Sequence, residues 1–191
     1  MNKIDLVPSQ NARMWQKYLR QEFPCILFKA NQQAQQKKLG MGTTLHKQSL
    51  IDRPELIEKM VSGSTAVGTE NLMNLLKNYA RIEGQAKAKQ TIYVGVVGFP
   101  NVGKSSLINS LKRSRAAATG NTPGVTKSTQ EVQLDKNIVL LDSPGVVLST
   151  KEQSDSLILR QAIKVEELND PIRPVEAIMA RIEEEEIQNL Y

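Results

Sequence analysis

The stretch GFPNVGKS at residues 98–105 decides the fold of this chain, because it matches every fixed position of the phosphate-binding pattern GxxxxGK[ST]. An apolar and β-branched run precedes it at residues 91–97 and predicts a buried parallel strand. Residues 105–112 follow with apolar side chains at helical spacing. Strand, glycine loop and helix in this order favour a phosphate site at a helix N-terminus over a chance glycine turn.

The residue types within this loop predict a triphosphate site. Lys104 is expected to bridge the β- and γ-phosphates, and the Ser105 hydroxyl is expected to ligate Mg²⁺. Backbone N–H groups would surround the phosphate oxygens. The loop residues predicted to bind the nucleotide are Asn101, Val102, Gly103, Lys104, Ser105 and Ser106.

A second element follows the next predicted strand, residues 137–141, which ends in the tetrapeptide DSPG. Asp142 can hold Mg²⁺ through a water, and Gly145 can offer its N–H group to a γ-phosphate. The pattern DxxG alone is a very common turn, so its position behind an apolar strand is what makes it a candidate switch.

The Gly/Pro loop NTPGVT at residues 121–126 contains Thr126, a candidate to complete the metal shell. An ordinary surface turn is the alternative interpretation of this loop. The predicted metal ligands are therefore Ser105, Thr126 and Asp142, and the predicted catalytic groups are Lys104, Thr126 and Gly145.

The tetrapeptide NKID at residues 2–5 predicts the reader of the base. Guanine presents two adjacent donors that one carboxylate, Asp5, can accept, whereas adenine would leave that carboxylate unpaired. Asn2 is expected to tie the tetrapeptide to the phosphate loop, and the stem of Lys3 to cover the base. Residues 25–28 predict a short strand that brings the Ala30 N–H group to the guanine carbonyl oxygen.

The order of these motifs is inverted relative to most small GTPases, and in this order the chain resembles a circularly permuted GTPase of the nucleostemin and nucleostemin-like family. The resemblance implies a Ras-like P-loop α/β domain over residues 1–150, with a mostly parallel sheet and helices on both faces. A C-terminal helical module is expected to begin within residues 151–191. Because Ras-like sheets place a strand before the base-reading motif, we expect the chain to be a fragment of a longer protein. The resemblance is carried by residues 2–5, 28–30, 70–72, 78–79, 94–111, 123–126 and 142–145.

The same resemblance implies a GTP-hydrolysing switch in assembly of the large ribosomal subunit, located in the nucleolus, with GTP or GDP and Mg²⁺ as cofactors. Its expected partners are a pre-ribosomal particle, ribosomal RNA and assembly factors. Val146 stands where Ras-like enzymes carry a water-orienting glutamine, so slow intrinsic hydrolysis is expected, with stimulation by a partner or by K⁺. Asn101 is either a K⁺ ligand or a residue that only stabilises the loop. The alternatives are a nucleotide-binding scaffold with negligible turnover and an ATPase, to which Asp5 is a direct objection.

The amino-acid composition indicates the class of partner and excludes several kinds of site. The 191 residues carry 25 basic and 20 acidic side chains, and this net charge of +5 favours acidic partners such as RNA. A single cysteine, Cys25, and a single histidine, His46, exclude a disulfide framework and a Cys/His metal site. No apolar run is long enough for a membrane span. Helices are also predicted at 9–21, 71–82, 154–164 and 175–189, and residues 32–47 are expected to form an exposed loop that is a candidate for RNA contact.

Overall fold

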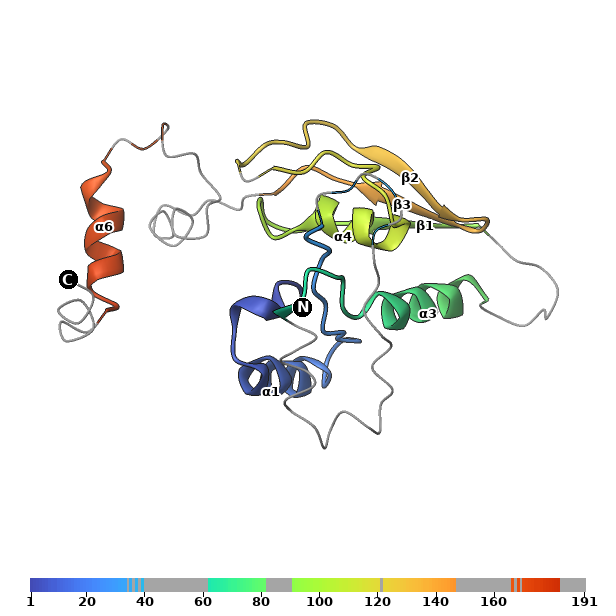
Figure 1. Cartoon of the computed structure of the whole chain (residues 1–191), viewed down its shortest axis with the longest axis horizontal. Helices are drawn as coiled ribbons and strands as arrows, with labels where there is room; N and C mark the ends of the chain where they lie inside the picture. The colour runs from blue at the N-terminus through green and yellow to red at the C-terminus, as the bar shows by residue number, and fades with distance from the viewer. Residues whose placement is uncertain are drawn as a thin grey trace.

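The computed structural model describes residues 1–33, 35, 37, 39, 62–81, 91–120, 122–146, 166, 168 and 170–182. These residues form an α/β arrangement of short helices and one sheet, shown in Figure 1. In chain order the elements are η1 (Ile4–Leu6), α1 (Ser9–Leu19), α3 (Thr69–Ala80), β1 (Ile92–Val96), α4 (Lys104–Lys112), β2 (Gln130–Asp135), β3 (Ile138–Asp142) and α6 (Ile172–Met179).

The described sheet has three strands in the order β1-β3-β2. Strand β1 runs parallel to β3, with Val96 opposite Asp142, so the carboxyl ends of both strands meet at one edge. Strand β2 pairs with β3 in the antiparallel sense, because only a short turn joins them and parallel strands need a long crossover. The expected mostly parallel sheet is therefore wrong for this part of the chain, where the sheet is mixed.

Helices α3 and α4 pack on one face of the sheet and form the main core (Figure 1). Ile138 and Leu140 are two positions apart on β3, so both side chains face the helices. Ile108 and Leu111 of α4 meet them, and Leu76 of α3 joins the same cluster. A covering helix on the opposite face stays a prediction. This core fixes α4, and with it the loop from which α4 starts, against the strand ends.

The first residues of the chain pair with the segment that follows α1. The Met1 ammonium donates to the Ile26 carbonyl at 2.7 Å, and the Phe28 N–H group donates to the Met1 carbonyl at 2.8 Å. Lys29 then pairs with Val67 in an isolated bridge. The predicted strand at 25–28 is wrong as a strand, because these contacts do not extend into a ladder, although Cys25 is buried as expected.

The other predicted helices are found with shifted ends. Those predicted at 9–21 and 71–82 are α1 and α3, each of which ends two residues earlier than expected. Helix α6 begins at Ile172, three residues before the predicted start, because Pro174 lies in its first turn, where proline is tolerated. The predicted helix 154–164, most of the loop 32–47 and the end of the predicted helix 175–189 lie outside the described residues. None of the described helices combines the length and apolar character needed to cross a bilayer.

Candidate nucleotide-binding site

The phosphate loop leaves the end of β1 and turns into α4 through residues in the left-handed region. Asn101 has a φ of 57° and Gly103 a φ of 92°, and Gly103 caps the helix. The Lys104 ammonium donates to the carbonyl oxygens of Gly98 at 3.1 Å and Phe99 at 2.8 Å, which holds it over the loop. Burial lowers the pKa of the Lys104 ammonium below its ordinary value, while the Asp142 carboxylate acts to raise it.

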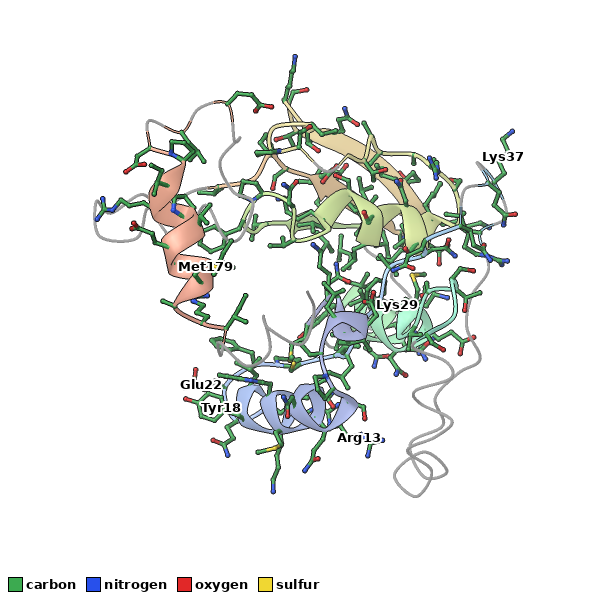
Figure 2. All side chains as sticks on the ribbon, turned by 60° about the vertical axis from the view of Figure 1, so that its left-hand side comes forward. Arg13, Tyr18, Glu22, Lys29, Lys37 and Met179 are labelled. Atoms are coloured by element: carbon green, nitrogen blue, oxygen red, sulfur yellow. The ribbon has the colours of Figure 1, made fainter. Side chains whose placement is uncertain are left out.

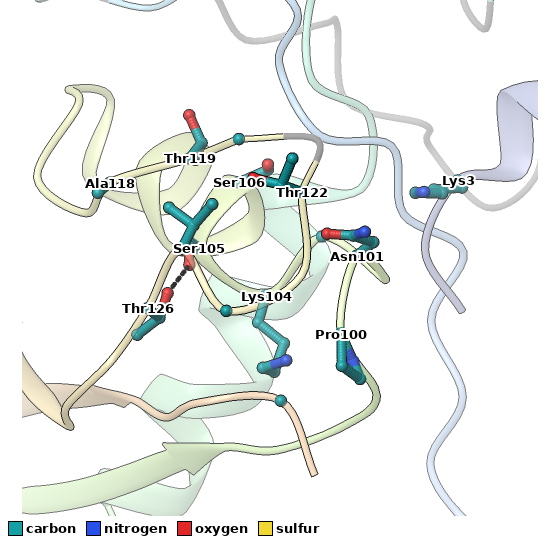
Figure 3. A pocket seen from close by; sticks show the side chains of 15 residues that line it. Lys3, Pro100, Asn101, Lys104, Ser105, Ser106, Ala118, Thr119, Thr122 and Thr126 are labelled. Carbon is teal, nitrogen blue, oxygen red and sulfur yellow. Dashed lines mark hydrogen bonds between the residues drawn. The ribbon is translucent and has the colours of Figure 1, made fainter. Parts of the chain in front are cut away.

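A corner of hydroxyl and carboxylate groups lies beside this lysine. The Ser105 hydroxyl donates to Asp142 Oδ2 at 2.8 Å and lies 3.1 Å from Thr126 Oγ1, a contact drawn in Figure 3. Asp142 is only 1% exposed, and its second oxygen, Oδ1, is buried with no hydrogen-bond partner among the described residues. Hard oxygen ligands around an unsatisfied carboxylate oxygen suit Mg²⁺, so these three residues fit the predicted ion.

Asn2 joins the tetrapeptide at residues 2–5, the predicted base reader, to the phosphate loop. Its side-chain N–H₂ group donates to the Val102 carbonyl at 2.9 Å and to the Gly103 carbonyl at 3.5 Å. The approach is so close that a Cβ on Gly103 would lie 2.4 Å from Asn2 Nδ2. A side chain at 103 would displace the Asn2 amide from its hydrogen bonds and would be strained by the backbone conformation. The contact places NKID next to the site although the chain separates the two motifs widely.

The predicted base-reading side comprises Lys3, Asp5 and the segment after Phe28. Lys3 has a φ of 58° and lines the pocket, and in Figure 3 its side chain points toward Asn101. Gln32 donates to Asp5 Oδ2 at 3.1 Å, which brings the Asp5 carboxylate close to the segment that contains Ala30. Asp5 and Ala30 do not themselves line the pocket. Their contacts with a base stay predictions.

The loop after β3 lies directly on the phosphate loop. The Val146 N–H group donates to the Gly98 carbonyl at 3.1 Å, and the Ser143 hydroxyl donates to the Val96 carbonyl at 2.6 Å. Gly145 packs against the buried Pro100. The Val146 side chain is 54% exposed and offers no polar group. The predicted γ-phosphate sensor therefore lies in contact with the loop whose ligand it would sense.

One pocket is lined by most of the residues predicted to form the site. Asn2, Val102 and Asp142 do not line it, but each contacts or adjoins a residue that does. Their roles as ligands, like those of the other predicted residues, stay predictions. The predicted residues that line it are Lys3, Asn101, Gly103, Lys104, Ser105, Ser106, Thr126 and Gly145.

The same pocket is lined by residues that the sequence analysis did not assign to the site. They share a place in the phosphate loop or in the segment that leads from α4 to Thr126. Small and Gly-rich composition over residues 118–125 was the available signal, since such segments allow close approach to a ligand. The unassigned lining residues are Pro100, Ala118, Thr119, Gly120, Thr122, Gly124 and Val125.

The loop between β1 and α4, with Asp142 at the end of the neighbouring strand, places this chain among the P-loop nucleotide-binding proteins. Comparison with known proteins narrows that class. Residues 93–190 match the family model described as 50S ribosome-binding GTPase.

Full-length relatives agree with the family match. The chain is 47% identical to the guanine nucleotide-binding protein-like 3 homolog of Caenorhabditis elegans, covering all of this chain and 32% of that protein. It is 45% identical to the guanine nucleotide-binding protein-like NSN1 of Arabidopsis thaliana. It is 47% identical to the guanine nucleotide-binding protein-like 3-like protein of Bos taurus. Both alignments cover all of this chain and 31% of the relative. This chain thus spans about a third of their length. The chain belongs to the 50S ribosome-binding GTPase family, in its nucleostemin group.

Proposed function

We propose that this chain is the nucleotide-operated switch of a protein that acts in assembly of the large ribosomal subunit. It binds GTP or GDP with Mg²⁺, hydrolyses GTP slowly, and acts on a pre-ribosomal particle in the nucleolus. The observation that carries the proposal is the contact of Asn2 with the phosphate loop beside the Ser105–Asp142 pair. This contact supports one site in which residues 2–5 would read guanine and the phosphate loop would hold the triphosphate, in a chain of this family.

The inverted motif order supports a circularly permuted Ras-like domain. The base reader comes first in the sequence and the phosphate loop later, yet the Asn2 side chain reaches the Val102 carbonyl. Residues 1–150 would form this domain and residues 151–191 would begin a helical module. Asp5 would accept the two guanine donors, after releasing Gln32.

Hydrolysis depends on how charge and water are positioned at the γ-phosphate. Lys104 and the metal corner of Ser105, Thr126 and Asp142 would stabilise negative charge, with the Gly145 N–H group as a further donor. When bound, Mg²⁺ supplies a positive charge at the phosphates. Val146 cannot orient water, so added positive charge from K⁺ beside Asn101, or help from a partner, would set the rate.

A second candidate function is a nucleotide-binding scaffold with negligible turnover. The exposed Val146 side chain favours it, because no polar group of that residue can activate water. Both candidates bind nucleotide at this site, but only in the switch does the nucleotide state change how the protein associates with its particle.

Binding is tested with fluorescent GDP and ADP added to this chain in Mg²⁺ buffer. Tight binding of GDP with weak binding of ADP is expected, and Lys104→Ala should lose it while Lys17→Ala on exposed α1 should not. Binding of neither nucleotide to the folded wild-type chain would contradict the proposal. GTP turnover measured in potassium and then in sodium buffer, with Asn101→Ala beside the wild type, tests the K⁺ site.

Switch and scaffold are separated in cells with the full-length protein. Under the switch, Lys104→Ala should impair release from pre-ribosomal particles in sedimentation profiles, whereas a scaffold that needs no nucleotide cycle would sediment as the wild type does. Imaging of a tagged full-length protein tests the nucleolar location, and exclusion from the nucleolus would contradict it.

A further inference from the structure

The end of the sheet opposite the nucleotide site carries a group of basic side chains. Helix α4 starts at the site with Lys104 and ends at Lys112, and β3 reaches the site with Asp142 but starts at Ile138. The last turn of α4 and the β2–β3 turn therefore lie at the far end of these elements. We call the basic end the five exposed residues Lys37, Lys112, Arg113, Arg115 and Lys136.

Hydrogen bonds to backbone groups hold these residues from three separate segments together. Lys37 forms an isolated bridge with Ser114, and Leu39 exchanges two hydrogen bonds with Arg113, one through the guanidinium Nε at 3.2 Å. Lys112 donates to the Gln133 carbonyl, which connects α4 to the β2–β3 hairpin next to Lys136. The cations thus belong to one built surface, and Figure 2 shows Lys37 projecting outward from it.

The charges of this surface are weakly compensated. The recorded side-chain partners of Lys112, Arg113 and Arg115 are backbone carbonyl oxygens, which carry no formal charge. Asp135, the carboxylate of the adjoining turn, lies 3.9 Å from the Lys77 ammonium and is shared with that further cation. Among the described residues the basic end therefore keeps a net positive charge, which attracts a polyanion.

The types of side chain at the basic end indicate which class of polyanion it suits. Protein interfaces are enriched in apolar and aromatic residues at their centre, and membrane surfaces need apolar side chains to insert. Among the described residues, the exposed aliphatic side chains lie elsewhere: on η1, α1 and α6, and around the site. The exposed rings of Tyr79 and Tyr93 belong to α3 and β1 rather than to the three segments of the basic end, and Tyr93 faces the side of the sheet away from α4. The described residues of these three segments include no aromatic ring on which an unpaired base could stack. Phosphates along the backbone of an RNA duplex meet all of these conditions.

We propose that the basic end is a docking surface for the phosphate backbone of double-stranded RNA, placed away from the nucleotide site. This assignment rests on the proposed function, because ribosome assembly is what makes RNA the available polyanion. RNA and nucleotide then bind at opposite ends of the same helix, α4, so both can be bound at once.

The test uses the 191-residue chain and a fluorescein-labelled RNA duplex of about 16 base pairs, followed by anisotropy over a salt series. Lys37→Ala with Arg115→Ala should lower the affinity about tenfold and reduce the slope of log K against log salt by about 1.5. A matched double variant, Lys17→Ala with Arg173→Ala, removes the same charge from exposed positions on α1 and α6 and should have a much smaller effect. Lys37→Arg with Arg115→Lys should keep the affinity.

Three outcomes would overturn the assignment. The first is equal loss in the two double-alanine variants, which would mean that only net charge matters. The second is unchanged RNA affinity in the variant of the basic end. The third is competition by polyglutamate as strong as by RNA, which would point to an acidic protein. Fluorescent GDP binding is measured on every variant to confirm folding. RNA binding without guanine binding would refute the proposed function and leave the surface in place, whereas the reverse would refute the surface alone.

Discussion

A Cβ atom on Gly145 would lie 2.6 Å from the backbone nitrogen of Pro100, so the loop after β3 has room for glycine alone at this contact. Pro100 is buried and the clashing atoms belong to its backbone and ring, which cannot rotate away. The two loops that would surround a γ-phosphate are therefore fitted to one another before any ligand arrives.

Gly145→Ala should separate these loops. We expect a loss of about 1–3 kcal/mol in the free energy of unfolding, as for other overpacked sites, or displacement of the loop with weaker binding of a non-hydrolysable GTP analogue than of GDP. Urea unfolding and fluorescent-nucleotide titration measure the two effects. Gly95→Ala in β1 is the matched control, because a Cβ there meets nothing within 4 Å. Equal behaviour of both variants would show that the contact has no energetic role.

Asn2→Asp should weaken the junction between the base reader and the phosphate loop. The change removes the donor to the Val102 carbonyl and places a carboxylate against carbonyl oxygens, at a cost of about 1–3 kcal/mol. Unfolding and GDP affinity should both decline. Asn74→Asp on the exposed side of α3 introduces the same chemical change as a control. An Asn2→Asp variant that binds GDP as tightly as the wild type would show that the Asn2–Val102 contact does not contribute to binding.

Asp5→Asn should alter which base binds. The variant amide cannot accept both guanine donors, so the preference for GDP over ADP should decrease about tenfold to a hundredfold. Xanthine carries an oxygen where guanine carries its amino group, so xanthosine diphosphate should bind the variant better than the wild type does. Competition titrations with the three nucleotides measure both changes. Retained guanine preference would show that another residue reads the base.

Lys104 should give the nucleotide-free protein a pH-dependent stability. Because burial lowers the pKa of Lys104, the unfolded state binds more protons between the lowered and the ordinary value, and stability rises with pH across that interval. The unfolding free energy of the wild type relative to Lys104→Met should therefore increase as the pH rises toward about 10.4. Lys17→Met serves as the control for general alkaline effects. A pH-independent difference between wild type and Lys104→Met would contradict the argument.

The sequence predicted which polar side chains lie together better than it predicted the sheet. Lys104, Ser105 and Asp142 were assigned from local patterns, because strand, loop and helix fix their positions over a few residues. Strand β2 was missed although Val132 and Leu134 alternate with polar neighbours, since such a half-exposed strand gives a weak signal beside its fully apolar neighbour. Its antiparallel direction follows from the short turn to β3 rather than from any motif.

Contacts between segments that lie far apart in the sequence were the other feature that could not be predicted. Nothing local to Pro100 signals that Gly145 packs on it, and nothing local to Gln32 signals its hydrogen bond to Asp5. The same holds for the basic end, whose cations come from segments that meet only after folding. Sequence patterns identify groups that act within one element, whereas tertiary packing decides which of them share a surface.

The hydrogen bond from Asn2 to Val102 joins positions that lie 100 residues apart, and this separation has a consequence for biosynthesis. The tetrapeptide at residues 2–5 is translated before the phosphate loop, so Asn2 lacks its Val102 partner until that loop has emerged. Long-range closure of this kind is slow, because the chain entropy is lost before the contact is gained. We expect the nascent chain to acquire its ligand only near the end of residues 1–145, which leaves a long interval in which chaperones rather than nucleotide must protect it.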